Sequence, residues 1–399
     1  MKKDWEYIKL SDACTIHGRI GWQGLTRAEH KRSGDYLLIT GTDFTEDNKI
    51  NLDTCVYVDE FRYTQDENIQ IRKNDLLITK DGTLGKLALI TEDLPKPATL
   101  NGGIFVIRDK INKLYPPFLL NYMKSDAFRK IIHNHRTGST VPHLTQNMLV
   151  NFPIPVPPLE EQKRIVKILD EKFAQLETIK ANAQTNLQNA KDLFQSQLTK
   201  AFSNTTWEKK RLGEVCDVRD GTHDSPKFYD KGYPLVTSKN LKNGKIEMIN
   251  LKYISKEDYE KINERSKVDI NDILFAMIGT IGNPVLVTEE PTYAIKNMAL
   301  IKDIGSIFPN YLLFYLSSNC ALDKMLHDSN GTTQRFVSLN YLRNFEIPLP
   351  PLPEQKRIVK ELDTLSEKVR QLQEIYTKQI ANCDELKQSY LQKAFEGEL

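Results

Sequence analysis

Two long stretches of the chain carry apolar or small residues at every third or fourth position. They run from 159 to 203 and from 352 to 396, and neither contains an internal Gly or Pro apart from Pro353 near the start of the second. A Pro-Pro pair precedes each stretch and suits a helix entry. This heptad-like spacing predicts two helices of roughly 65 Å each.

The apolar residues of each predicted helix form a stripe along one side, and this stripe needs an apolar partner that buries it. The first stripe consists of Val166, Leu169, Phe173, Leu176, Ala183, Leu187, Ala190, Phe194 and Leu198. The second consists of Val359, Leu362, Val369, Leu372, Tyr376, Ile380, Cys383, Leu386 and Tyr390. Burial of each of these side chains stabilises the helix pair by at most about 1.5–3 kcal/mol. This outweighs the stabilisation of about 0.3–0.5 kcal/mol from one surface ion pair. We therefore expect the helices to pair as an antiparallel coiled coil, with a globular head at each end.

The rest of the chain has short β-rich runs between turn signals. Residues 36–40, 75–79 and 104–107 are expected to be strands, and a helix is expected from Pro116 to about His133. We therefore expect an α/β (α+β) fold. The predicted domains are a first head (1–157), a central helix (158–204), a second head (205–350) and a C-terminal helix (351–399).

The chain contains an internal repeat with an offset of about 193–202 residues. NFPIPVPPLEEQKRIVK at 151–167 recurs as NFEIPLPPLPEQKRIVK at 344–360, and LFQSQLTKAF at 193–202 recurs as LKQSYLQKAF at 386–395. Earlier in each half, NDLL at 74–77 recurs as NDIL at 271–274. Matches of this length indicate a duplication. The fold should therefore have an approximate internal two-fold symmetry.

Composition places the chain among ordinary globular proteins. It has 399 residues, 40% of them hydrophobic and 27% charged, with a formal net charge of +2. No signal peptide or apolar span is seen, so we expect a cytoplasmic protein without a membrane partner. Five scattered cysteines without a CxxC pair indicate neither a zinc site nor a disulfide framework. The near-zero charge argues against a polycation but leaves room for local basic surfaces.

Familiar catalytic motifs are missing from the sequence. There is no GxxxxGK[ST] phosphate loop. The adjacent His133-Asn134-His135 lacks the spread of a nuclease site. Tyr115-Pro116-Pro117-Phe118 lacks the polar residue that an adenine methyltransferase loop places before its prolines. We predict a chain that is not an enzyme by itself, with no catalytic and no metal-binding residues.

Loop chemistry nominates residues that would contact DNA. In the first head, residues 17–32 combine four basic residues, three glycines and Trp22, which suits a phosphate backbone and groove edges. A solvated turn with a partly buried Trp22 is an equally open interpretation. The glycine turn after residue 79 and the polar loop 136–143 add further candidates. The full set in this head is Arg19, Trp22, Gln23, Arg27, Lys31, Arg32, Lys80, Thr83, Ser139, Thr140 and His143.

The corresponding loops of the second head are polar but less basic. Gly-Thr turns offer backbone amides and hydroxyls to phosphates, although a simple capped turn is the alternative for each. The candidates there are Arg219, Thr222, His223, Lys227, Lys239, Thr280, Thr332, Thr333, Gln334 and Arg335. Divergent loops on one scaffold suggest two different target sites.

The two halves share the segments PLEEQKRIVKILD and PLPEQKRIVKELD, and they also share LFQSQLTKAF and LKQSYLQKAF, which both end in Ala-Phe. With these segments the chain resembles the DNA specificity subunits of type I restriction–modification systems. The resemblance covers the whole chain. It implies that each head is a target-recognition domain that reads one half of a bipartite site in double-stranded DNA. The helices would set the spacing and dock two methyltransferase subunits, and motor/nuclease subunits would complete the complex. No cofactor is implied for this chain: S-adenosylmethionine, ATP and Mg²⁺ would be bound by the partner subunits.

An alternative of a different class is a two-headed coiled-coil adaptor that binds proteins rather than DNA. The basic loop 17–32 discriminates between the two interpretations, because a DNA reader needs a phosphate-binding surface and a protein-binding adaptor does not.

Overall fold

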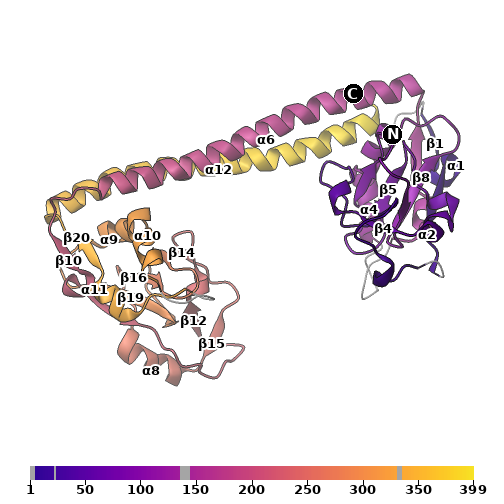
Figure 1. Ribbon diagram of the computed structural model, residues 1–399. Coiled ribbons are helices and arrows are strands. Elements are labelled where there is room, and N and C mark those ends of the chain that lie inside the picture. Colours follow the sequence, from indigo (N-terminus) through magenta and orange to yellow (C-terminus); the bar gives the residue numbers. More distant parts are fainter. Residues whose placement is uncertain (1–4, 22–23, 135–143, 330–334) are drawn as a thin grey trace. The chain divides into compact units, whose positions relative to one another are not determined.

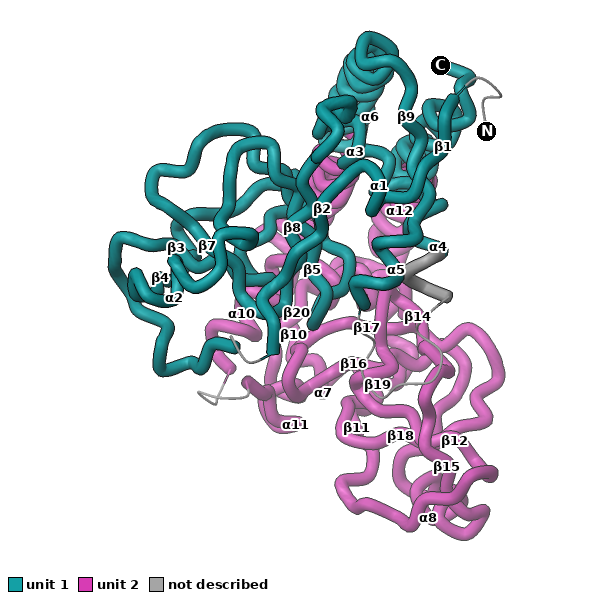
Figure 2. The backbone as a smooth tube through the Cα atoms, turned by 90° about the vertical axis from the view of Figure 1, so that its right-hand side faces the viewer, with its two compact units in different colours: residues 1–182, 379–399 teal, residues 183–378 magenta. Residues whose placement is uncertain are grey.

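The computed structural model describes residues 5–21, 24–134, 144–329 and 335–399. The chain divides into two compact units (Figure 2). Unit 1 consists of residues 1–182 and 379–399, and unit 2 consists of residues 183–378. Each unit therefore combines one head with a part of each long helix.

Two sheets form the head of unit 1. The larger is antiparallel, with strand order β2-β8-β5-β6, and the smaller has the order β4-β3-β7, in which β3 and β7 are parallel. The strands of the larger sheet are β2 (Cys14–Gly18), β8 (Ile104–Asp109), β5 (Leu76–Thr79) and β6 (Leu87–Leu89). Those of the smaller sheet are β4 (Val56–Val58), β3 (Tyr36–Ile39) and β7 (Ala98–Leu100). A further pair, β1 (Glu6–Lys9) with β9 (Pro153–Val156), leads into the long helix.

The head of unit 2 repeats this topology. Its four-stranded sheet has the order β11-β19-β16-β17 and its three-stranded sheet the order β15-β12-β18. The strands are β11 (Cys216–Asp220), β19 (Met298–Asp303), β16 (Ile273–Ala276), β17 (Gly282–Leu286), β15 (Lys252–Ile254), β12 (Tyr233–Thr237) and β18 (Ala294–Lys296). Two further strand pairs are short, namely β13 (Leu241–Lys242) with β14 (Lys245–Ile246), and β10 (Lys209–Arg211) with β20 (Glu346–Pro348). The predicted duplication and mixed fold are confirmed.

Short helices pack against the sheets of each head. In unit 1 these are α1 (Leu10–Ala13), α2 (Glu60–Thr64), α3 (Pro116–Met123), α4 (Asp126–Asn134) and α5 (Gln146–Val150). In unit 2 they are α7 (Leu212–Val215), α8 (Lys256–Ser266), α9 (Pro309–Leu316), α10 (Asn319–His327) and α11 (Leu339–Asn344). The single helix expected from Pro116 is two helices. The chain turns at Lys124 and at the buried Ser125, whose hydroxyl donates to the Tyr122 carbonyl at 2.6 Å.

The two long helices are present and lie side by side (Figure 1). They are α6 (Leu159–Ala201) and α12 (Leu352–Glu396). Two ion pairs in unit 1 show their antiparallel direction: Lys180 contacts Asp384 at 2.7 Å, and Glu177 contacts Lys387 at 2.9 Å. The predicted antiparallel pairing of these two long helices, called the rods below, is therefore confirmed.

Two residues of the predicted stripe do not lie in the helix seam. Leu372 is 38% exposed and Leu386 is 46% exposed. A pair of helices buries a narrow stripe only, so apolar residues at its margin stay on the surface. At the rod ends the heads add to the burial, because Ile165 joins the core of unit 1 and Ile358 that of unit 2.

Each unit has its own core in which a head and the rod ends share side chains. In unit 1, Phe395 of α12 meets the rings of Phe118 and Tyr122 edge-on, with centroids 5.3 and 4.9 Å apart. In unit 2, Phe202 meets Tyr311 and Tyr315 in the same way, at 5.4 and 5.2 Å. Edge-to-face contacts at these distances fix ring orientation as well as burying apolar area. The heads are therefore anchored to the rods by aromatic packing.

The repeated Asn-Asp pair serves the fold. Asn74 and Asn271 have left-handed φ values of 73° and 71°, and each precedes a buried aspartate. Asp75 accepts from Arg108 Nε and Nη2, both at 2.7 Å, while Asp272 pairs with Lys302 in unit 2. Breaking a buried ion pair costs about 3–5 kcal/mol, because it leaves one charge uncompensated. The motif thus ties the start of β5 or β16 to the neighbouring strand.

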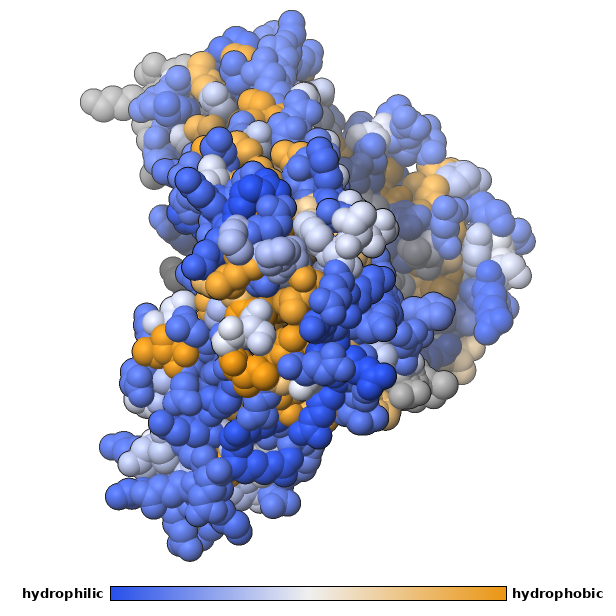
Figure 3. All heavy atoms as spheres, turned by 90° about the vertical axis from the view of Figure 1, so that its left-hand side faces the viewer, coloured by the Kyte–Doolittle hydropathy of each residue, from blue (hydrophilic) through white to orange (hydrophobic). Residues whose placement is uncertain are grey.

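One face of the surface is shown in Figure 3, and it is largely hydrophilic with apolar side chains gathered in patches. Within the described part of the chain, no helix combines the length and the apolar composition that crossing a bilayer requires.

Candidate nucleic-acid interface

A groove of about 730 Å³ lies in the head of unit 2. It is bordered by the turns after β12, β16 and β18 and by the loop that follows β11. Its lining residues include Ser225, Phe228, Thr237, Ser238, Lys239, Asn240, Lys242, Glu247, Ile249, Asn250, Lys252, Ile278, Gly279, Thr280, Lys296 and Asn297. Two of them, Lys239 and Thr280, are residues that loop chemistry nominated.

Positive charge dominates this groove. Four lysines line it, namely Lys239, Lys242, Lys252 and Lys296, against the single carboxylate of Glu247. Glu247 accepts from Lys242 at 2.8 Å, so three ammonium groups are left to set the local potential. A cleft lined by one sign of charge focuses its field on a ligand of opposite sign. The phosphate backbone of DNA is such a ligand.

The loop after β11 is held against β18 by close backbone contacts. A Cβ atom at Gly221 would lie 2.5 Å from the Ile295 carbonyl oxygen, so only glycine fits there. Thr222 donates its amide to Ile295 at 3.1 Å, and the Lys296 ammonium reaches the Asp224 carbonyl at 2.8 Å. The groove edge is therefore fixed by the fold.

His223 lies at the rim of the groove. Its Nδ1 is 3.0 Å from Asn297 Oδ1 and its Nε2 is 2.8 Å from Asp220 Oδ2. These contacts hold the ring beside Asn297, whose left-handed φ of 55° turns its side chain at the end of β18. His223 thus contacts a residue of the groove lining, while neither His223 nor Thr222 is itself part of that lining.

An aromatic and apolar edge adjoins the lysines. Lys252 lies over the ring of Phe228 at 4.2 Å from its centroid, and Lys227 lies over Tyr229 at 5.6 Å. Phe228 is 38% exposed and Ile249 is 68% exposed. Exposed apolar groups among cations suit contact with base faces and thymine methyl groups. Sequence reasoning missed Phe228, although the Lys-Phe-Tyr run at 227–229 was a signal for it.

The other candidates of unit 2 have different surroundings. Arg219 pairs with Asp217 at 2.6 Å and donates to the Arg265 carbonyl at 3.0 Å, outside the groove lining. Arg335 is exposed, and its carbonyl accepts from the amide of Gly279 at 3.0 Å, which places it beside the groove. Thr332, Thr333 and Gln334 lie outside the described residues.

In unit 1, Arg19 is committed to the interior. It is 3% exposed, and it donates from Nε to the Leu100 carbonyl at 2.9 Å and from Nη2 to Thr99 Oγ1 at 3.2 Å. Burial, together with the nearby Arg62, lowers its pKa. In this conformation the guanidinium joins the end of β2 to β7, which is a structural role.

The remaining candidates of unit 1 lie on its surface or outside the described residues. Arg27 and Arg32 are exposed, and Lys31 forms an ion pair with Asp59. Lys80 lies over the ring of Phe105 at 4.7 Å, and Thr83 is exposed in the following turn. Trp22, Gln23, Ser139, Thr140 and His143 lie outside the described residues.

Comparison with known proteins identifies the family. The sequence model of the type I restriction modification DNA specificity domain matches residues 2–188 and 204–380. The chain belongs to this type I specificity family. Two separate matches agree with the two heads and their shared topology, and the function of DNA sequence recognition expected from the repeated motifs is confirmed at the level of the family.

Relatives within the family span most of the chain. The specificity subunit of the type I restriction enzyme EcoBI of Escherichia coli is 26% identical over 366 residues, 84% of this chain and 75% of that protein. The type I restriction enzyme MjaVIII specificity subunit of Methanocaldococcus jannaschii is 24% identical over 392 residues, 91% of this chain and 86% of that protein.

Solved structures share the fold. A chain from a study of complex assembly and conformational transition of the type I R-M system has a TM-score of 0.77 and 23% identity, covering 99% of this chain and 98% of that chain. The HsdS subunit from Thermoanaerobacter tengcongensis has a TM-score of 0.60 and 22% identity, covering 100% and 98%. Both support the architecture of two heads and two long helices.

Within the described residues, no group of three or more His, Cys, Asp and Glu side chains is arranged to hold a metal ion.

Proposed function

We propose that the unit 2 groove reads one half of a bipartite DNA site, and that unit 1 reads the other half. The observation that carries this proposal is the meeting of Lys239, Lys252 and Lys296 with an exposed apolar edge in one hollow of a family that recognises DNA. Lysines would hold phosphates, while Thr280, Asn297 and Phe228 face base edges.

The chain would supply sequence choice and not catalysis. We propose that two methyltransferase subunits dock on the rods and that motor/nuclease subunits join them. These partners would bind S-adenosylmethionine, ATP and Mg²⁺. Exposed apolar residues on the rods, such as Leu372, Ile375 and Leu386, support a docking role. The five free cysteines fit action in the reducing cytoplasm.

Replacement of groove lysines tests the DNA interface. The chain is co-expressed with its methyltransferase partner, and binding to duplex DNA is measured over a range of salt concentrations. The double variant Lys239→Ala/Lys252→Ala should weaken binding and lower the slope of log K against log salt by about two, because each phosphate contact contributes about 0.9. The control is Lys261→Ala on α8, an exposed lysine outside the groove lining. An unchanged slope in the double variant would contradict the assignment of the groove.

Mapping of methylated adenines separates phosphate contacts from base reading. Phe228→Ala and Thr280→Val should relax one half-site and leave the other intact, since both residues lie in unit 2. The adaptor alternative predicts that neither the lysine nor the Phe228 variants alter any DNA property of the complex.

A further inference from the structure

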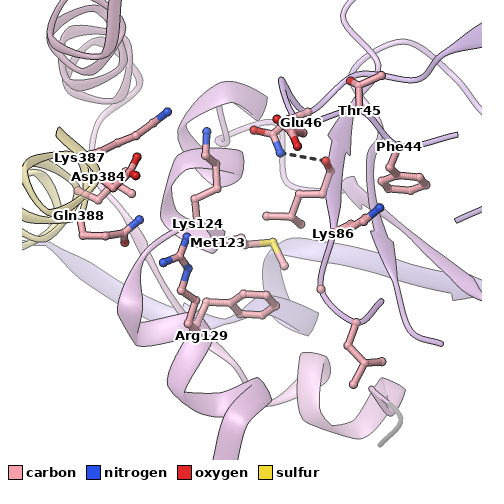
Figure 4. Close-up of a pocket in the computed structure, with 16 residues that line it drawn as sticks. Phe44, Thr45, Glu46, Lys86, Met123, Lys124, Arg129, Asp384, Lys387 and Gln388 are labelled. Carbon is pink, nitrogen blue, oxygen red and sulfur yellow. Dashed lines mark hydrogen bonds between the residues drawn. The ribbon is translucent and has the colours of Figure 1, made fainter. Parts of the chain in front are cut away.

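A hollow of about 730 Å³ in unit 1 is lined by none of the residues proposed above for DNA contact (Figure 4). It is bordered by residues 44–48, the turn 84–87, the break between α3 and α4, and the last turns of α12. Its lining consists of Phe44, Thr45, Glu46, Asn48, Leu84, Gly85, Lys86, Leu87, Met123, Lys124, Phe128, Arg129, Asp384, Lys387, Gln388 and Leu391. All of these residues belong to unit 1, so the hollow is a feature of one compact body.

Cations outnumber carboxylates in this hollow. Lys86, Lys124, Arg129 and Lys387 line it, against Glu46 and Asp384. The Asp384 carboxylate is taken by Lys180, which lies outside the lining, at 2.7 and 3.0 Å. Figure 4 shows Lys124 and Arg129 on the α3–α4 side of the space and Lys387 on the α12 side.

Lys124 is the most unusual of the four. Its ammonium lies 5.8 Å from the centroid of the Phe173 ring, and Lys387 lies 5.2 Å from the same ring. Among the described residues, no hydrogen-bond acceptor or ion-pair partner contacts the Lys124 ammonium, whereas Lys387 has Glu177 at 2.9 Å. Burial and the Lys387 charge lower the pKa of Lys124, and Asp170 opposes them.

The fold itself does not require these charges. In unit 2 the equivalent positions of Lys86, Lys124, Arg129 and Lys387 are Asn283, Ser317, Leu322 and Phe194.

In unit 2, uncharged side chains make contacts at the equivalent junction. Phe194 packs edge-on against Phe314 at 6.3 Å, and Gln195 donates to the Ser317 carbonyl at 3.4 Å. The duplicated unit therefore builds the same junction from uncharged side chains, and the cations of unit 1 need another explanation.

We propose that this hollow binds a phosphorylated small molecule whose phosphoryl oxygens contact Lys124, Arg129 and Lys387. Several cationic donors that line one hollow match the several oxygens of a phosphoryl group, and the planar guanidinium of Arg129 suits a bidentate contact. The volume falls in the range of about 300–1,000 Å³ that is usual for small-molecule sites. Met123, Phe128 and Leu391 provide an apolar wall for the rest of the ligand. This inference does not rest on the proposed DNA groove.

Thermal unfolding of the full chain tests the site with two probes, inorganic phosphate and adenosine triphosphate. A ligand that binds the folded state raises Tm in proportion to the logarithm of its concentration once the site is occupied. We expect such a rise for the unaltered chain, beyond that seen with sodium chloride at equal ionic strength. Lys124→Met keeps the apolar stem and removes the charge, and it should weaken the apparent affinity by about tenfold or more.

Lys130→Met is the matched control, because Lys130 is an exposed lysine of α4 outside the hollow. It should keep the full response to both probes. An equal response in Lys124→Met and the unaltered chain would overturn the proposal. A shift that depends on Lys124 with duplex DNA, but with neither probe, would also overturn it, because the site would then serve the DNA backbone. If Lys124→Met does not fold, Arg129→Gln at an exposed position gives the same test.

Discussion

Arg19 shows that a residue type suited to DNA can be committed to the interior. Its guanidinium reaches the Leu100 carbonyl, Thr99 and Gln65 from the end of β2. Five donors in a rigid fork can satisfy several acceptors at once, and a lysine cannot reproduce that geometry. The basic loop 17–32 therefore has at least one member whose first task is to hold the two sheets together.

Substitution of Arg19 should lower stability. Arg19→Lys is expected to reduce the free energy of unfolding by about 1–3 kcal/mol, because buried acceptors lose their partner. Urea unfolding followed by circular dichroism measures the change. Arg27→Lys, at an exposed position of the same loop, is the control and should change stability by less than about 0.5 kcal/mol. Equal stabilities for the two variants would show that the Arg19 contacts contribute nothing.

The cysteines should differ sharply in reactivity. Burial raises the pKa of Cys14, Cys55 and Cys216 to about 12, so these thiols stay protonated at neutral pH. Cys383 is buried as well, and Cys320 on α10 is exposed. Because the thiolate is the nucleophile, maleimide at pH 7 should label Cys320 first. Mass spectrometry of peptides checks this order, and Cys320→Ser should remove the fast phase. Fast labelling of Cys14 would contradict the described packing.

The sequence indicates which kinds of residue suit DNA contact, but it predicts less well which individual residues line the groove. Lys239 and Thr280 were nominated and line the groove, whereas Lys252, Lys296 and Phe228 were not nominated. Strands from distant parts of the chain bring those three together, and a reading of one loop at a time does not detect such proximity. Arg19 is a residue type that suits DNA contact and was predicted to make one. Its burial depends on a contact with β7, some eighty residues further along the chain.

At the scale of elements, the repeated glutamine of the EQKR motif joins head to rod. Gln162 is buried, accepts from the Tyr115 amide at 2.8 Å, and donates to the carbonyls of Lys113 and Pro157, both at 2.8 Å. Gln355 makes two of the matching contacts in unit 2, with the Phe308 amide at 2.8 Å and the Pro350 carbonyl at 2.9 Å. One side chain thus ties the first turn of the rod to the start of α3 or α9.

Loss of this amide should loosen the head. Gln162→Leu leaves the Tyr115 amide and two carbonyls without their partner, at a cost of about 1–3 kcal/mol for each group that stays buried. Thermal unfolding should show a lower Tm, and hydrogen exchange should speed up at residues 113–118. Gln184→Leu, on the exposed side of α6, is the control. If Gln162→Leu matches that control in both measurements, the motif does not join the elements as described.

Elements with strong periodicity were predicted well, and elements that depend on caps were not. The stripe from Val166 to Leu198 gave α6, and the β-rich runs gave β3, β5 and β8. The break between α3 and α4 was missed because it depends on how Lys124 and Ser125 cap the end of one helix. Leu372 and Leu386 follow the heptad spacing but lie outside the seam, since spacing alone does not say how wide the buried stripe is.

At the scale of the whole molecule, duplication lets one scaffold carry two different surfaces. Equivalent positions are buried in both cores: Leu169 and Leu362 correspond to each other, and each is buried in the aromatic-rich junction of its own unit. The surfaces have diverged, since the basic groove described here belongs to unit 2 and the cationic hollow belongs to unit 1. Packing constrains a buried position on all sides, while a loop residue is constrained by its ligand.

Separate cores predict separate responses to core substitutions. Leu169→Ala and Leu362→Ala should each cost about 2–5 kcal/mol, the usual range for a buried leucine. Because each leucine belongs to one core, the loss should fall on one unit, and a scan of the unaltered chain need not be a single two-state transition. Hydrogen exchange followed by mass spectrometry assigns the loss: Leu169→Ala should speed exchange in β5 and β8, and Leu362→Ala in β16 and β19. The two variants serve as controls for each other. Equal acceleration in both sheets by either variant would mean that the long helices couple the units into one cooperative body, and a half-site could then not be altered without affecting the stability of the other head.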